Sequence, residues 1–245
     1  LPLIERSADE ALVVARALDR VDDQNMALRA YDLHVDLRGG AAGVAEGVRL
    51  ARARILAVTT DREDEAVREF RALSTSTRIQ VGAPALDLWA GLRARQGRAE
   101  DVQTLRGWLL DCYPSSAEAV DVVFFRGDDA HDRNDLDAAM SDYQRVRDMV
   151  PDQDRAGLAT MRSAQIHLVR RDPARAAQVY EDYLSEFPNG RRWQEASYWA
   201  ARTRLSLGDS ARARVLIRRL RGDDPFSYYT VMAADLLGER FQVHL

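Results

Sequence analysis

The fold is decided by the stretch from Tyr180 to Gly238, which reads YEDYLSEFPNGRRWQEASYWAARTRLSLGDSARARVLIRRLRGDDPFSYYTVMAADLLG. Within it, the polar break Gly208-Asp209 is followed by a segment rich in small and apolar residues that ends at Asp224-Pro225. The same signal occurs one copy earlier, from Arg171-Asp172 to Phe187-Pro188. A break, a helix-forming segment and a closing proline therefore repeat along the chain.

The repeat has a constant period of 37 residues. Breaks begin at positions 97, 134, 171 and 208, and prolines stand at positions 114, 151, 188 and 225. Residues in fixed columns, mostly small, accompany them: Val102, Ala139, Ala176 and Ala213 follow the breaks, and Ala90, Gly127, Ala164 and Ala201 precede them. Small residues are needed where two helix backbones approach closely, and a period of this length is typical of a solenoid of helical hairpins.

The register continues upstream with less regular loops. A break at Asp61 puts Ala66 and Phe70 in the columns of later units, and a break at Asp22 does the same for Ala27 and Tyr31. The closing prolines are missing there, and Gly39, Gly40, Gly43 and Gly47 loosen the region between. We expect the same architecture in this part of the chain.

Each unit is predicted to be two helices. We expect first helices near Asp9–Val21, Glu46–Val58, Pro84–Gln96, Ala119–Asp132, Ala156–Arg170 and Gln194–Leu207, and second helices such as Pro173–Glu186 and Ser210–Arg221. In Pro173–Glu186 the apolar residues recur at helical spacing, and no alternating β-branched run competes with this interpretation. The prediction is an all-α fold, a right-handed α-solenoid of helical hairpins, divided into irregular hairpins over 1–82, four regular hairpins over 83–225 and a closing helix over 226–245.

Composition limits the classes of function. The 245 residues carry a net charge of −4 and no lysine, so no basic field indicates nucleic acid. No apolar run reaches the ~18 residues that a membrane span needs. The single cysteine, Cys112, excludes an internal disulfide and is expected to be a small buried residue. The chain begins at Leu1 without methionine, which suggests a mature or trimmed fragment.

No pattern of residues predicts a metal, cofactor or catalytic site. The acidic stretch Asp128–Asp137 lacks the ligand order and glycine of a calcium loop, because Leu136 occupies a ligand position. It is better explained as the end of one helix and the N-cap of the next. His34, His131, His167 and His244 have no metal-binding spacing, and no nucleophile elbow or phosphate loop occurs. The chain alone is therefore not expected to be an enzyme.

Two late clusters are candidates for binding. Arg212, Arg214, Arg218, Arg219 and Arg221 border the apolar stripe of one helix, which indicates a solvated face or a docking surface for an acidic partner. Aromatic residues gather at Trp193, Tyr198, Trp199, Phe226, Tyr228 and Tyr229. Their positions fit packing between hairpins, and they also fit a groove for a sugar or a peptide.

Two segments near the end of the chain resemble known families. The pattern Tyr183-Leu184-x-x-Phe187-Pro188-x-Gly190, followed by Glu195-Ala196-x-Tyr198-Trp199-Ala200-Ala201-Arg202, is similar to tetratricopeptide-type proteins of the cell envelope. The segment Ser227-Tyr228-Tyr229 with Ala233-Ala234-x-Leu236-Leu237-Gly238 resembles the end of the α-superhelix of soluble lytic transglycosylases. In that family the superhelix precedes a lysozyme-like domain that cleaves peptidoglycan with one glutamate as acid and base.

The resemblance implies a non-catalytic scaffold in the periplasm or cell envelope. The family's catalytic glutamate is followed by serine, and this chain has no Glu-Ser pair, so no catalytic residue can be transferred. The implied role is to shape substrate access for a catalytic domain downstream or to dock partners. The implied partner is a glycan strand of peptidoglycan or an envelope protein. The alternative is a tetratricopeptide-like adaptor for protein–protein interaction. The candidate contact residues are Arg192, Trp193, Tyr198, Tyr228 and Tyr229.

Overall fold

The computed structural model describes residues 7–58 and 61–238, and every regular element in these ranges is a helix. The helices are α1 (Ala8–Arg20), α2 (Gln24–Leu37), the short 3-10 helix η1 (Ala41–Gly43), α3 (Glu46–Leu56), α4 (Glu63–Leu73), α5 (Ile79–Arg95), α6 (Ala99–Cys112), α7 (Ala117–Asp132), α8 (Leu136–Met149), α9 (Asp154–Val169), α10 (Pro173–Glu186), α11 (Trp193–Ser206), α12 (Ser210–Asp223) and α13 (Tyr228–Leu236). The all-α prediction is confirmed.

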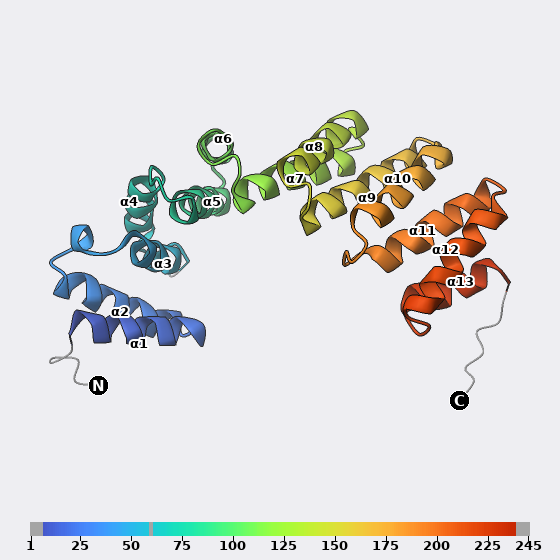
Figure 1. Cartoon of the computed structure of the whole chain (residues 1–245). Helices are drawn as coiled ribbons and strands as arrows, with labels where there is room; N and C mark the ends of the chain where they lie inside the picture. Colours follow the sequence, from blue (N-terminus) through green and yellow to red (C-terminus); the bar gives the residue numbers. More distant parts are fainter. Residues whose placement is uncertain (1–6, 59–60, 239–245) are drawn as a thin grey trace. The chain divides into compact units, whose positions relative to one another are not determined.

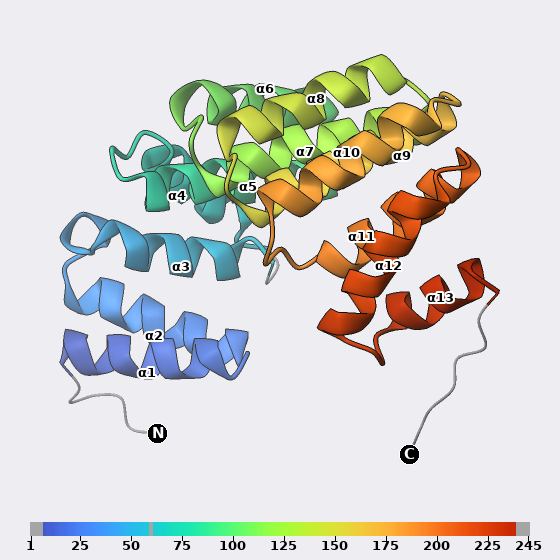
Figure 2. The ribbon, with the colours of Figure 1, turned by 45° about the vertical axis from the view of Figure 1, so that its right-hand side comes forward.

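The chain divides into two compact units, Leu1–Ala119 and Val120–Leu245, and the boundary in the sequence falls within the first turn of α7. In the first unit α1–α2, α3–α4 and α5–α6 are antiparallel hairpins (Figure 1). In the second unit α7–α8, α9–α10 and α11–α12 are the hairpins, and α13 packs on both α11 and α12 (Figure 2). Each helix contacts chiefly its neighbours along the sequence, which is the organisation of a repeat protein.

In most hairpins the two helices are joined by the same type of turn, and the predicted break residues lie in this turn. The break residues Asp22, Gly97, Asn134, Arg171 and Gly208 all have a positive φ, between 59° and 80°. In each case the next amide donates to a carbonyl five residues earlier, as Asp172 N does to His167 O at 2.8 Å. This is the Schellman ending of a helix, which needs one left-handed residue.

The residue after the break starts the next helix. Asp23, Asp135, Asp172 and Asp209 each accept a hydrogen bond on the side chain from the backbone N–H three residues later, at 3.0–3.3 Å. Arg98 occupies this position in the remaining copy and makes no such bond. An N-cap aspartate satisfies a backbone donor that the helix leaves unpaired. Two adjacent residues therefore end one helix and begin the next.

The predicted columns form the core. In the second helices Ala27, Ala66, Ala139, Ala176 and Ala213 are all fully buried. Tyr31, Phe70, Tyr143 and Tyr180 follow four residues later in the same helices and are at most 2% exposed. The upstream register that was predicted from Asp22 and Asp61 is thus confirmed by burial. Gly127 belongs to the close-approach column, since an added Cβ would lie 3.0 Å from the Tyr143 ring.

Proline marks the exit from each regular hairpin. Tyr113, Val150, Phe187 and Asp224 precede the four spaced prolines and leave the helical region, with φ between −123° and −148°. The ring of a following proline disfavours helical geometry at the residue before it. The regularly spaced prolines therefore determine where the second helix of each regular hairpin ends.

Helix bounds agree with the prediction within two residues, except at one start. The helix expected from Pro84 begins at Ile79, so Pro84 lies inside α5. A proline inside a helix removes one hydrogen bond and its ring crowds the carbonyl four residues earlier, and this cost is offset here because Val81 and Ala83 of the extra turn are buried. Gly82 permits this turn to lie against Tyr113, whose Oη an added Cβ would approach to 1.9 Å.

The first unit also contains a charged network. Arg52, which is 6% exposed, donates to Asp32 at 2.7 Å and to Glu65, and Arg62 donates to the same two carboxylates. Burial alone would raise the pKa of Asp32, but the hydrogen bonds from Arg62 and Arg52 outweigh it and the pKa is lowered. The same balance lowers the pKa of Glu65. The network ties α2, α3 and α4 together.

Candidate functional site

Aromatic residues of the second unit form a continuous row from the core to the surface. Tyr180 stacks on Trp199 with ring centroids 6.5 Å apart, and Trp199 meets Tyr198 at 5.5 Å. Tyr198 contacts Tyr229 at 5.8 Å, and Tyr229 contacts Tyr228 at 5.2 Å. Tyr180 is fully buried, whereas Tyr228 is 69% exposed. These five residues are called the aromatic row below.

Local sequence places the outer end of the row. Ser227 caps α13 by accepting a hydrogen bond from Thr230 N at 3.2 Å, which puts both tyrosines in the first turn of the helix. Thr230 is buried and its hydroxyl donates to Asp224 O at 2.6 Å, so the loop after α12 is fixed to the start of α13. Tyr229 then points back to α11 and Tyr228 remains in solvent.

Two arginines accompany the row. The Arg202 guanidinium lies 5.0 Å from the centre of Trp199, and no carboxylate pairs with it within the described ranges. Arg192 pairs with Glu195 at 2.9 Å, and its backbone N–H donates to Tyr183 Oη at 3.1 Å. Burial raises the pKa of Tyr229 and Glu195 raises it further. The Tyr229 hydroxyl therefore stays protonated and can donate a hydrogen bond at neutral pH.

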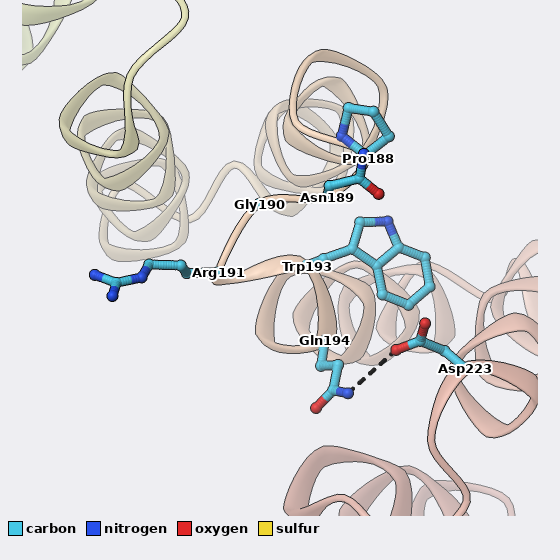
Figure 3. Close-up of a pocket in the computed structure, with 7 residues that line it drawn as sticks. All are labelled: Pro188, Asn189, Gly190, Arg191, Trp193, Gln194 and Asp223. Carbon is cyan, nitrogen blue, oxygen red and sulfur yellow. Dashed lines mark hydrogen bonds between the residues drawn. The ribbon is translucent and has the colours of Figure 1, made fainter.

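Trp193 lies apart from the row. It is buried at the start of α11, where the Arg219 guanidinium of α12 covers it at 4.9 Å. It lines a polar pocket of about 390 Å³ with Pro188, Asn189, Gly190, Arg191, Gln194 and Asp223 (Figure 3). Gln194 Nε2 donates to Asp223 at 3.2 Å across the pocket. Of the five predicted contact residues, Tyr198, Tyr228 and Tyr229 are in the row, Arg192 lies beside it, and Trp193 faces this pocket.

The basic run on α12 is partly used within the fold. Arg212 pairs with Glu181 at 3.0 Å, and the same carboxylate accepts from Arg204 at 2.8 Å. Arg219 covers Trp193, while Arg218 donates to Arg214 O at 3.4 Å. The side chains of Arg212, Arg218 and Arg219 therefore have partners within the second unit.

The acidic stretch and His34 also have structural partners. Asp128 accepts from Tyr143 Oη at 2.6 Å and pairs with Arg162 at 3.3 Å. Within 7–58 and 61–238, no three His, Cys, Asp or Glu side chains gather closely enough to hold a metal ion. His34 is buried with Nδ1 2.6 Å from Ala8 O, and His244 lies outside the described residues.

The expectation for Cys112 is wrong. Cys112 is exposed at the C-terminal end of α6, although its spacing puts it on the same helix face as Leu105 and Leu109, which are buried. Sequence reasoning also left Arg202 out of the candidate site. The signal was its place three residues after Trp199, which puts both side chains on one face of a helix.

No helix in the described part of the chain is long and apolar enough to cross a membrane.

No protein-family model matches the sequence, and no curated protein matches it. Solved structures do match. The chain resembles PilW, a widely conserved type IV pilus biogenesis factor, with 16% identity and a TM-score of 0.50 over 92% of this chain and 97% of that one. A tetratricopeptide repeat protein from Parabacteroides merdae has 17% identity and a TM-score of 0.50, over 94% of this chain and 90% of that one. Pseudomonas aeruginosa PilF has 17% identity and a TM-score of 0.50, over 92% and 95%. At these identities the likeness establishes the fold, a tetratricopeptide-like array of helical hairpins.

Proposed function

We propose that the chain is a non-catalytic scaffold that binds a protein partner, and that the aromatic row with Arg202 is its contact surface. Two observations of the row carry this proposal: Tyr228 at its outer end is exposed, and the Arg202 guanidinium over Trp199 has no carboxylate partner in the described ranges. Tyr, Trp and Arg contribute most strongly to protein interfaces, because they combine large apolar area with hydrogen bonding. A tetratricopeptide-like fold supports this function by presenting such surfaces on a rigid array.

The test is a selection with a random 12-residue peptide library displayed on phage. Peptides enriched on the wild-type protein are then measured as synthetic peptides against Tyr228→Ala and Arg202→Gln. Tyr228 is 69% exposed, so its removal leaves the core intact. We expect each substitution to weaken binding by about tenfold, the loss of a ~1.4 kcal/mol contact. The matched control is Arg218→Gln on α12, which should bind like the wild type.

Two outcomes contradict the proposal. Enriched peptides that bind both variants as tightly as the wild type would move the contact surface elsewhere. A selection that enriches no peptide above a blank surface would argue against peptide binding by the chain.

A second candidate follows from the resemblance of Ser227–Gly238 to the end of a lytic transglycosylase superhelix. In this proposal the same surface lies against a glycan strand in the cell envelope and serves a catalytic domain elsewhere in a longer protein. The support is the sequence resemblance together with the tyrosines that α13 presents. Aromatic rings and hydrogen-bond donors suit sugar rings.

Purified peptidoglycan sacculi separate the two candidates. Co-sedimentation of the wild type, reduced in Tyr228→Ala, would favour the glycan scaffold, while peptide binding without co-sedimentation favours the adaptor. The chain alone should release no 1,6-anhydro muropeptides, and release of such products would disprove its non-catalytic role in either form.

A further inference from the structure

The first unit contains an apolar pocket that the proposed function does not use. Its volume is about 490 Å³, within the ~300–1,000 Å³ of typical ligand pockets. It lies over α5 and is bordered by the end of α4 on one side and by α6 on the other. The lining residues are Arg71, Ser74, Thr75, Leu86, Trp89, Trp108 and Cys112.

Two tryptophans form its apolar wall. The rings of Trp89 and Trp108 meet edge to face, with centroids 6.4 Å apart at 61°. Trp89 is 6% exposed, whereas Trp108 is 48% exposed and keeps much of its indole in solvent. An exposed indole beside a buried one leaves apolar surface that a further ring or aliphatic side chain can cover.

The rim of the pocket is positively charged. The Arg71 guanidinium lies 5.6 Å from the centre of the Trp89 ring, and no carboxylate pairs with it in the part of the chain that the structure describes. Trp89 Nε1 is buried and has no hydrogen-bond acceptor among these residues. Both features favour an occupant that brings oxygen acceptors, in particular a carboxylate placed near Arg71.

The hydroxyl groups at the rim indicate the remaining chemistry. Ser74 Oγ donates to Arg71 O at 2.9 Å, and Thr75 Oγ1 donates to Ala72 O at 3.4 Å. Each hydroxyl has used its one proton and keeps its lone pairs. The rim can thus accept hydrogen bonds from N–H groups, which a peptide backbone supplies.

We propose that this pocket docks a short segment of a protein partner in which an aromatic side chain is next to a carboxylate. The aromatic ring packs against Trp89 and Trp108, the carboxylate pairs with Arg71, and backbone N–H groups meet the two hydroxyls. The pocket lies in a different unit from the aromatic row. Its test is therefore independent of the proposed function.

Cys112 makes the test possible on the intact chain. It is the only cysteine, is exposed and lines the pocket. Four short peptides, Cys-Gly-Asp-Trp, Cys-Gly-Lys-Trp, Cys-Gly-Asp-Ala and Cys-Gly-Lys-Ala, are each exchanged with Cys112 as mixed disulfides. Titration with β-mercaptoethanol and intact-mass measurement gives the reductant concentration at which half the protein remains labelled, which reports non-covalent binding beside the thiol.

The expected order follows from the lining. The Asp-Trp peptide should resist reduction best, by about tenfold over Asp-Ala because an aromatic side chain is buried, and by about threefold over Lys-Trp from an exposed ion pair. Arg71→Gln should remove the preference for Asp over Lys, and Trp108→Ser should remove the preference for Trp over Ala. Reactivity of Cys112 towards a small disulfide and the helical circular dichroism should be unchanged in both variants.

Other results overturn the proposal. Equal resistance of the four peptides would show that the pocket holds no peptide side chain. A Lys-Trp preference that survives Arg71→Gln would exclude the acidic partner. A simple octyl disulfide that resists reduction more strongly than every peptide would indicate a lipid chain as the occupant instead.

Discussion

The left-handed turn offers the most direct test of how sequence sets this fold. Arg171 and Gly208 occupy equivalent positions, with φ of 59° and 80°. A residue with a Cβ costs ~1–2 kcal/mol in this conformation, while glycine adds ~0.5–1 kcal/mol of entropy to the unfolded chain. The net effect of exchanging the two residue types is therefore about 1 kcal/mol. Gly208 isolates this backbone cost, since an added Cβ would meet nothing within 4 Å.

The perturbation is a reciprocal pair in one unit. Arg171→Gly should stabilise the second unit by about 1 kcal/mol, and Gly208→Ala should destabilise it by a similar amount. With a urea m-value of ~2 kcal/mol/M, each change moves the unfolding midpoint by about 0.5 M, in opposite directions. Circular dichroism at 222 nm during urea unfolding measures both.

The reasoning is refuted if the two changes shift the midpoint in the same direction, or if Gly208→Ala is neutral. The double variant is the control for additivity: it should unfold near the wild-type midpoint, because the sites belong to different turns.

Three further expectations concern stability. Asp32 has a lowered pKa in the folded state, so its contribution to the free energy of unfolding is present above the unfolded pKa of ~4 and is lost as pH falls through the folded pKa. When the pH is lowered below 4, the urea midpoint of the wild type should therefore fall more steeply than that of Asp32→Asn. Gly82→Ala should destabilise the first unit by ~1–3 kcal/mol, since the added Cβ would meet the Tyr113 ring. Gly107→Ala in α6, where an added Cβ meets nothing within 4 Å, should instead stabilise it by ~0.5–1 kcal/mol. Equal urea midpoints of the two variants would contradict this. Tyr143→Phe should lower the free energy of unfolding by ~1–2 kcal/mol, because it removes the hydrogen bond to Asp128. The Tyr180 hydroxyl is buried without a partner in the described ranges, so Tyr180→Phe should be neutral or stabilising in the same assay.

Sequence predicted the fold well because the determining signals are local. A left-handed residue followed by aspartate, and a proline that ends the second helix, lie within a few positions of the structures they specify. The start of α5 was missed for the opposite reason. Burial of Val81 and Ala83 against other helices outweighs the signal of Pro84, and such packing is not visible in a single segment.

The candidate site was predictable only in part. Residues on one helix face, such as Trp199 and Arg202, are related by spacing. Contacts between helices, such as that of Tyr198 with Tyr229, depend on how α13 packs on α11. The pocket beside Trp108 needs three helices at once, and no motif in the sequence marks it. The predicted division of the chain at residues 82 and 83 stays a prediction.

The identical turn also affects how such a gene can change length. Deletion of residues 172–208 would join Arg171 directly to Asp209, which leaves a left-handed residue followed by a capping aspartate. Ala164 of α9 and Ala213 of α12 belong to the paired columns, so the new hairpin keeps small residues at its close approach. Unequal recombination between two copies of the repeat would therefore add or remove two consecutive helices and leave an intact turn at the new junction. A chain shortened in this way should remain folded and lose the helical circular dichroism of two helices.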